Sequence, residues 1–277
     1  MDDALLPLSR KAWGDLEVLH VVGYFAPEVS QEYVDLGLHK SLSYFPARAA
    51  AFGEAGPGLT VATFYVFAPW LVEAALPAAW RTTTPAALVE ARRRGTATAL
   101  RGLLGEPDVA EALGIARAVC EGLTPQGRPL YAAHAGLDWP EDDLLALWHA
   151  ATLIREHRGD GHLSVLQTSG VDPVEATVLG GLFSGTTGFL RKTRGWTDEE
   201  YDAATGRLLA RGWLDADGAF TDLGRDERRR IEDETDRLAL EGWAHVGAER
   251  TARLHELVKP LRERIIETGP LPRTIRP

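Results

Sequence analysis

Apolar residues recur every three to four positions along most of this chain, and glycine and proline punctuate the runs. This spacing is typical of α-helices that bury one face, because 3.6 residues complete a helical turn. The predicted helices cover 28–40, 42–52, 59–76, 84–104, 108–121, 140–158, 162–169, 173–190, 197–211, 222–241 and 247–267. Residues 212–221 indicate a strand, a turn and a strand, since Asp217-Gly218 supplies the positive φ of a tight hairpin. We therefore expect a mainly α fold with a small β-hairpin.

The hairpin and its flanking helices resemble the winged-helix domain of MarR-type regulators. The runs LLARGWL, DADG and FTDLGR within residues 208–225 carry this resemblance. It implies a winged-helix fold, with residues 212–221 as the wing. A winged helix by itself says little about activity, because one fold hosts many functions.

The two halves of the chain show a weak internal similarity. Residues 44–53 match 162–170 as a short apolar helix ending at glycine, and 84–105 match 197–218 in span and pattern. We expect two winged-helix-like halves, residues 1–137 and 138–277, packed as a pseudo-dimer. The alternative is chance likeness between helix pairs in an alanine-rich chain.

Charge argues against DNA binding by the second half. The net charge is −10 and the pI near 5.3, whereas nucleic-acid-binding domains are usually basic. The helix 197–211, which would enter the major groove, begins Thr-Asp-Glu-Glu-Tyr-Asp, and the wing tip is Asp-Ala-Asp-Gly. The acids also suit a helix N-terminus, which is a purely structural reading. The basic residues just before this helix, Arg191, Lys192 and Arg194, are the local feature that would favour DNA binding. We do not expect nucleic acid to be the partner.

Ionisable residues directly follow a helix that the pattern predicts to be buried. Residues 144–154 are apolar nearly all round, and 155–162 read Arg-Glu-His-Arg-Gly-Asp-Gly-His. Arg155 and Arg158 continue an apolar stripe, so they need partners, whereas Glu156 continues the stripe of His149 and Thr152.

Three interpretations of residues 155–162 remain open. In the first, Gly159 caps the helix and the charged residues only complement the helix end. In the second, the turn lines a pocket where an arginine holds an anion and a histidine–carboxylate pair moves a proton. In the third, His157, Asp160 and His162 bind a metal, although their spacing matches no strong zinc or iron motif and no metal is expected.

The pocket interpretation assigns roles to particular residues. The residues expected to move a proton are Glu156, His157, Asp160 and His162. The residues expected to bind the ligand are Arg155, Arg158, His149, Tyr44, Arg48 and Tyr65. The last three belong to an aromatic group that is also suited to a core. They would reach the pocket only if the halves pack together, because pockets commonly form at such interfaces.

Several runs together resemble an actinobacterial family of helix-turn-helix proteins. They include YFPARAAAFG, ATFYVF, GRPLYAAHAGLDWP, LWHAATLIREHRGDGH and RGWTDEEYDAA, and REHRGDGH is the most specific. The resemblance covers nearly the whole chain and implies a winged-helix fold without a settled activity. The sequence departs from the usual pattern at SLSYFPARAAAF, on the first-half side of the expected pocket.

These observations favour a protein that binds a small polar or anionic molecule and no longer binds DNA. It would be a cofactor-free acid–base enzyme of secondary metabolism, or a protein that sequesters a ligand. The alternatives are a MarR-like, ligand-responsive transcription regulator and a structural or partner-binding module. With no long apolar run or signal pattern, we expect a cytoplasmic location.

Overall fold

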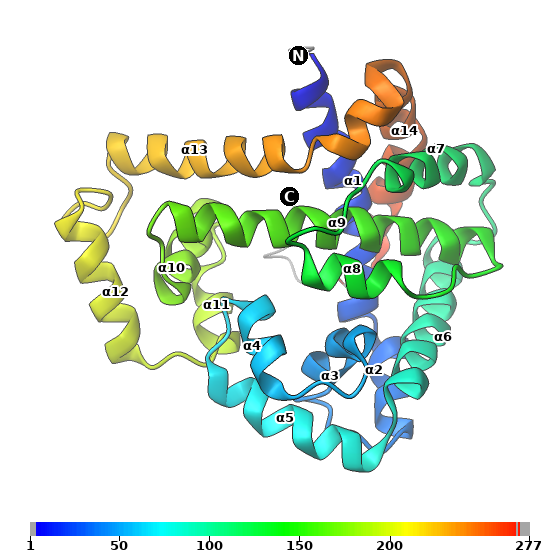
Figure 1. Cartoon of the computed structure of the whole chain (residues 1–277), viewed down its shortest axis with the longest axis horizontal. Helices are drawn as coiled ribbons and strands as arrows, with labels where there is room; N and C mark the ends of the chain where they lie inside the picture. The colour runs from blue at the N-terminus through cyan, green and yellow to red at the C-terminus, as the bar shows by residue number, and fades with distance from the viewer. Residues whose placement is uncertain (1–3, 270, 272–277) are drawn as a thin grey trace.

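The computed structural model describes residues 4–269 and 271, and helices dominate it (Figure 1). In chain order they are α1 (Leu5–Phe25), α2 (Pro27–Asp35), α3 (Tyr44–Ala49), the 3₁₀-helix η1 (Ala50–Phe52), α4 (Pro57–Phe64), α5 (Pro69–Thr82), α6 (Pro85–Leu104), α7 (Ala110–Glu121), α8 (Pro129–Ala135), α9 (Asp143–Thr168), α10 (Pro173–Ser184), α11 (Thr187–Thr193), α12 (Asp198–Ala210), α13 (Asp222–Leu238) and α14 (Glu241–Thr268). Within the described residues, no helix combines the length and apolar character needed to cross a membrane.

Helix α9 runs through the middle of the molecule (Figure 1). It packs against α1, α6, α7, α8 and α13. Every residue from Leu144 to Ile154 is buried, which agrees with the all-round apolar sequence of this stretch. The helix begins where the Asp142 side chain accepts a hydrogen bond from the Leu145 backbone N–H.

The main hydrophobic core lies around the first half of α9. It is built mainly from α1, α6, α7, α9 and α14. Helix α14 bends at Gly247, whose φ of 80° interrupts the helical backbone. The core therefore joins helices from both sides of residue 137, and a division of the chain there stays a prediction.

Three smaller cores accompany the main one in the described residues; the smallest packs Val174 against Tyr201 and Ala204, and the other two are larger. One gathers Phe45, Phe64 and Phe67 from the region of α3 to α5. The other packs the end of α9 against α10, α12 and α13 through Leu166 and Ile231. The chain turns sharply at Tyr65, with φ 27°, between α4 and α5.

The all-α class is confirmed, but the predicted wing is wrong. No β-strand forms within residues 4–269, so the expected pair of winged-helix halves with a β-hairpin is not present. The turn at Asp215–Gly218 does form, and Leu214 and Phe220 make a single antiparallel bridge. Pairing stops there because the Trp213 N–H bonds to the end of α12 and Thr221 caps the start of α13.

The glycines at 159 and 161 do not end a helix. The predicted helices 140–158 and 162–169 are one helix, α9, so residues 155–162 lie along its length rather than in a turn. Conversely, the predicted helices 59–76 and 173–190 are each broken into two. Helices α1 and α8 were not predicted.

Helices α2 and α6 pack with their backbones in close contact at Gly95. A Cβ atom at this position would lie 2.6 Å from the Cα of Val29, which is too close for any real contact. A Cβ atom at Gly102, in the same helix, would meet nothing within 4 Å outside the backbone of α6 itself. Gly102 therefore tests helix propensity alone.

We expect Gly95→Ala to destabilise the fold by about 1–3 kcal/mol, because α2 must move away from α6. Gly102→Ala should instead stabilise it by about 0.5–1 kcal/mol, since alanine favours a helix interior. Urea unfolding of both variants measures the difference. Equal effects of the two substitutions would contradict the close packing at Gly95.

Candidate functional site

A buried ion cluster forms around Glu156 in the middle of α9. Its side chain is 1% exposed. Arg48 of α3 donates from one terminal nitrogen to both carboxylate oxygens, at 3.0 Å each, and Arg155 donates at 2.6 Å. Tyr24 of α1 donates to the same carboxylate at 3.3 Å. The cluster therefore joins α1, α3 and α9.

The charges of this cluster shift the pKa values of its members. Burial alone would raise the pKa of Glu156, but the positive charges of Arg155 and Arg48 hold it well below its usual range. Burial raises the pKa of nearby Glu17, only partly opposed by Arg155. Glu156 thus stays ionised between the two arginines.

A cavity of about 90 Å³ opens beside Arg48, among α1, α2, α3 and α6. We name it the Arg92 cavity. Its polar lining consists of the hydroxyls of Tyr24, Ser30, Tyr33, Ser43 and Tyr44 and the cationic groups of Lys40, Arg48 and Arg92. No carboxylate is among its lining residues. The lining therefore offers many hydrogen-bond donors and positive charge without a negative group.

Arg92 is the unusual member of this lining. It is 3% exposed, and its guanidinium lies over the rings of Tyr24 and Trp148, at 5.2 and 5.0 Å from their centroids. Its Nε and one terminal nitrogen are buried without a hydrogen-bond partner in the described part of the chain. No carboxylate there lies within ion-pair distance of it. A buried guanidinium in this state lacks the partner that such groups normally require.

Two histidines border Arg92 on its other side. His134 and His149 line a narrow space together with Arg92 and Thr152. The Nε2 atoms of both histidines are buried without a partner within the residues described. Burial and nearby arginines lower their pKa values, to about 3 for His134 and about 4 for His149, so both rings are neutral at pH 7.

The structure separates most of the residues expected to move a proton. His157 lies 2.5 Å from Glu241, whereas Asp160 accepts the backbone N–H groups of Leu130 and Tyr131 at the start of α8. His162 bonds to Thr235 of α13 at 2.8 Å. These three groups have different partners along α9 and do not meet Glu156 at a common point.

The residues expected to bind a ligand fall into two groups. Tyr44 and Arg48 line the Arg92 cavity, and His149 borders Arg92. Arg158 is instead paired with Asp236 and Glu232. Arg155 is paired with Glu156. The Tyr65 hydroxyl donates to the Val171 carbonyl at 2.7 Å. The structure thus brings Arg48 to Glu156, with Tyr44 bonded to Arg48, but it does not bring Arg158 or Tyr65 there.

Sequence reasoning missed the role of Arg92, and a signal for it existed. On the helix 84–104, Arg92 continues the apolar stripe of Leu88 and Ala91, which makes its burial predictable in the same way as that of Arg158. Tyr24 and Tyr33 gave no comparable signal, since α1 was not predicted and both look like ordinary core residues.

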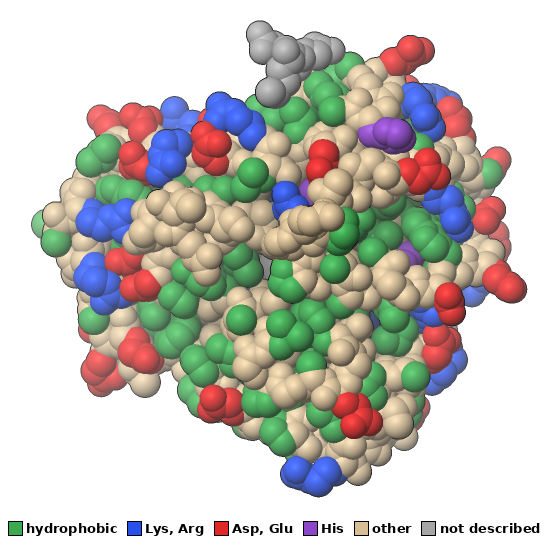
Figure 2. All heavy atoms as spheres, in the orientation of Figure 1, with side chains coloured by type: hydrophobic (Ala, Val, Ile, Leu, Met, Phe, Trp, Pro, Cys, Tyr) green, Lys and Arg blue, Asp and Glu red, His purple; other side chains and the backbone are tan. Residues whose placement is uncertain are grey.

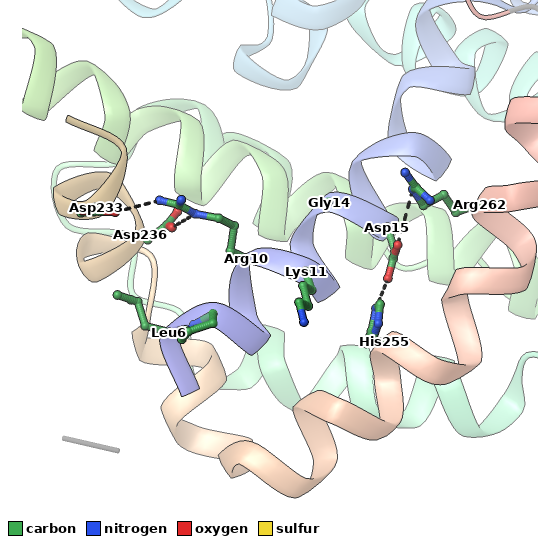
Figure 3. Close-up of a pocket in the computed structure, with 10 residues that line it drawn as sticks. Leu6, Arg10, Lys11, Gly14, Asp15, Asp233, Asp236, His255 and Arg262 are labelled. Carbon is green, nitrogen blue, oxygen red and sulfur yellow. Dashed lines mark hydrogen bonds and ion pairs between the residues drawn. The ribbon is translucent and has the colours of Figure 1, made fainter. Parts of the chain in front are cut away.

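A wider groove of about 650 Å³ lies between α1, α13 and α14 (Figure 3). Its charged side chains largely satisfy one another: Arg10 pairs with Asp233 and Asp236, and Asp15 pairs with His255 and Arg262. These pairs bridge the helices, and none of the groove's described lining residues has a buried polar atom without a partner. The groove is therefore a weaker binding candidate than the Arg92 cavity.

Helices α10, α11 and α12 form a compact group at one end of the molecule (Figure 1). The first turn of α12 is acidic and exposed, with 86% of the Asp198 side chain and 82% of that of Asp202 accessible. Arg191 pairs with Asp198 at 2.9 Å. In the view of Figure 2, basic and acidic side chains are interspersed rather than gathered into one basic face.

The chain belongs to a helix-turn-helix family, whose match covers residues 9–272. No curated protein and no solved structure matches it. Membership indicates a fold of the DNA-binding type without specifying a ligand or an activity. The family match gives no evidence for the actinobacterial origin or for the MarR-type features expected from the sequence.

We expect Glu156→Gln to destabilise the protein by about 3–5 kcal/mol, because it leaves the buried Arg48 without its counter-charge and the half-buried Arg155 with Glu17 alone, at 3.7 Å. Glu90→Gln is the matched control, since it breaks the exposed pair with Arg93 and should cost about 1 kcal/mol or less. Urea unfolding at neutral pH measures both. A Glu156→Gln variant as stable as the control would show that the cluster does not hold the helices together.

Four buried histidines and the half-buried His162 predict a loss of stability in mild acid. Burial lowers the pKa values of His20, His134, His149, His157 and His162, to about 3 for His134 and about 4 for the last three. Below the usual histidine pKa of about 6.5 the unfolded chain takes up protons that the folded chain does not, so folding weakens as pH falls.

Asp160 works in the opposite direction, because burial raises its pKa to about 6 and the folded chain keeps its proton longer. Its effect on the free energy of unfolding offsets that of about one histidine. We therefore expect the urea midpoint to fall steeply from about pH 7 to about pH 5. A flat profile over this range would mean that the histidines titrate as they do in water.

Proposed function

We propose that the protein binds a small oxyanion, or the anionic end of a small molecule, in the Arg92 cavity. The observation that carries this proposal is the buried guanidinium of Arg92, which has two nitrogens without a hydrogen-bond partner and no counter-ion among the described residues. A buried polar group without a partner costs about 1–3 kcal/mol of stability. An anion in the cavity would remove that cost and supply the missing charge.

The size and lining of the cavity suggest the class of ligand. A volume of about 90 Å³ is about three times the share of a water molecule in the liquid, which is about 30 Å³. This space suits a phosphate, sulfate or carboxylate group, not a whole cofactor. The hydroxyls of Ser30, Tyr33 and Tyr44 and the three cationic side chains match the acceptor oxygens of such a group. The protons of Tyr24 and Ser43 already have acceptors in Glu156 and the Lys40 carbonyl.

The anion clamp that we propose differs from the one expected from the sequence. Arg155 and Arg158 already have carboxylate partners, whereas Arg92 has none in the described part of the chain. Arg48 contributes from the same side, although Glu156 holds one of its terminal nitrogens. The charge of Glu156 would then position Arg48 rather than contact the ligand.

His134 and His149 would add hydrogen-bond acceptors beside the site on this proposal. Both rings are neutral, and both have a buried Nε2 atom without a partner in the described residues, next to Arg92. Their pKa values of about 3 and about 4 make them weak bases at pH 7, so they would accept a hydrogen bond from a bound molecule without taking its proton.

We expect Arg92→Leu to abolish the binding of small oxyanions in the Arg92 cavity without destabilising the protein, because leucine removes an unpartnered charge from the interior. Inorganic phosphate and acetate are the probes, with calorimetric titration as the measurement and urea unfolding as the check on the fold. Arg94→Leu is the matched control, since Arg94 sits on the same helix but is 57% exposed and pairs with Glu32.

Binding of either probe to wild type and to Arg94→Leu, lost in Arg92→Leu, supports the proposal. Native mass spectrometry of the purified protein adds a second readout, because a co-purifying anion should also disappear in Arg92→Leu. The proposal fails if wild type binds neither probe and carries no anion, or if Arg92→Leu binds as wild type does.

A second candidate function is ligand-responsive DNA binding. The family match favours it, and α10, α11 and α12 form the compact helical group that such a role would use. The exposed acids of α12 oppose it, because they would face the phosphate backbone. A salt-sensitive mobility shift with DNA from upstream of its own gene, altered by phosphate, would establish this function in place of simple binding.

A further inference from the structure

A second cavity, of about 190 Å³, lies where the end of α9 meets α10, α11 and α13. We name it the Arg228 cavity. Leu166, Leu179, Leu190 and Ile231 give it an apolar wall, while His162, Arg194 and Arg228 supply nitrogen atoms. No carboxylate is among its lining residues, and it shares no lining residue with the Arg92 cavity.

Both arginines of this cavity have unmet hydrogen-bonding capacity. Arg228 is 9% exposed; one terminal nitrogen contacts Glu232 at 2.6 Å, and the other is buried without a partner in the described residues. Arg194 packs over the ring of Phe67, at 4.4 Å from its centroid, and its Nε is likewise buried and unpartnered there.

The local charge balance around the cavity is positive. Glu232 pairs with Arg228 and also with Arg158, which has Asp236 as a second carboxylate partner. Arg194 has no carboxylate within ion-pair distance in the part of the chain that is described. His162 adds no charge at neutral pH, because burial lowers its pKa to about 4. A single negative charge would therefore be accommodated here.

From this combination we infer that the Arg228 cavity binds a monocarboxylate with a compact apolar body. Its volume somewhat exceeds that of a protein cavity of about 150 Å³ known to hold benzene. The carboxylate would accept hydrogen bonds from Arg194 and Arg228, and the ring or short hydrocarbon chain would pack against the leucines. Binding here would not require an occupied Arg92 cavity.

Helix α11 gives the site a local readout. It spans only Thr187–Thr193, none of its residues is buried, and Arg194 is its C-cap residue. A short helix with so little burial opens easily, and its amide hydrogens exchange fast. A carboxylate held by Arg194 would slow exchange in residues 187–194.

The test uses benzoate as the probe and benzamide as its neutral match. Calorimetric titration and hydrogen exchange are measured on wild type, Arg194→Leu, Arg228→Leu and the control Arg229→Leu, whose side chain is 65% exposed. We expect benzoate to bind wild type and Arg229→Leu and to slow exchange in α11. Affinity should fall by about tenfold or more in Arg194→Leu and Arg228→Leu, since each loses a charge-assisted hydrogen bond, and benzamide should not bind.

Ala176→Leu provides a variant that keeps both arginines, because Ala176 lines the cavity and a larger side chain would fill it. It should lose benzoate binding as well, with its fold checked by urea unfolding. Arg92→Leu should bind benzoate as wild type does, which separates this site from the Arg92 cavity. The inference is overturned if benzoate does not bind wild type, or if Arg194→Leu, Arg228→Leu and Ala176→Leu all keep wild-type affinity.

Discussion

Glu156 lies in α9 with almost none of its side chain exposed, and the guanidiniums of Arg48 and Arg155 surround its carboxylate. Arg48 comes from α3, 108 residues away in the chain, so this contact attaches the small aromatic core to the central helix. A carboxylate in such a place is tolerated only when its counter-charges are near. The Arg92 cavity exists beside this pair because Tyr24 and Arg48, which donate to Glu156, also form part of the cavity wall.

Elements with long apolar stripes and local start signals were predictable from the sequence. The expected helices 84–104 and 197–211 agree closely with α6 and α12, which Thr84 and Thr197 cap. Helix α8 was not predictable in this way, because its first N–H groups are satisfied by Asp160, about 30 residues away. The hairpin prediction was wrong for a related reason. Trp213 bonds to the end of α12 and Thr221 caps α13, and the β-propensity of residues 212–221 gives no information about these contacts.

For the site as well, features set by helical spacing were predictable, whereas partners on distant helices were not. Placing Glu156 on the stripe of His149 and Thr152 was possible from helical spacing, and these residues do lie on the face toward the Arg92 side of α9. The partners of Arg158 were not predictable, since Asp236 and Glu232 are on α13, whereas Asp160 is close in sequence and faces α8. Arg92 could have been found by the argument applied to Arg155, because it too continues an apolar stripe.

Helix α9 lines the Arg228 cavity and the narrow space beside Arg92, although none of its residues lines the Arg92 cavity itself. Thr152 borders Arg92 near its middle and His162 reaches the Arg228 cavity, ten residues on, which is about 15 Å at the helical rise. Helix α9 also packs against α6, which carries Arg92. A ligand that orders the end of α9 at the Arg228 cavity would therefore leave less entropy to lose at Arg92, so occupancy of either cavity would favour occupancy of the second through rigidity.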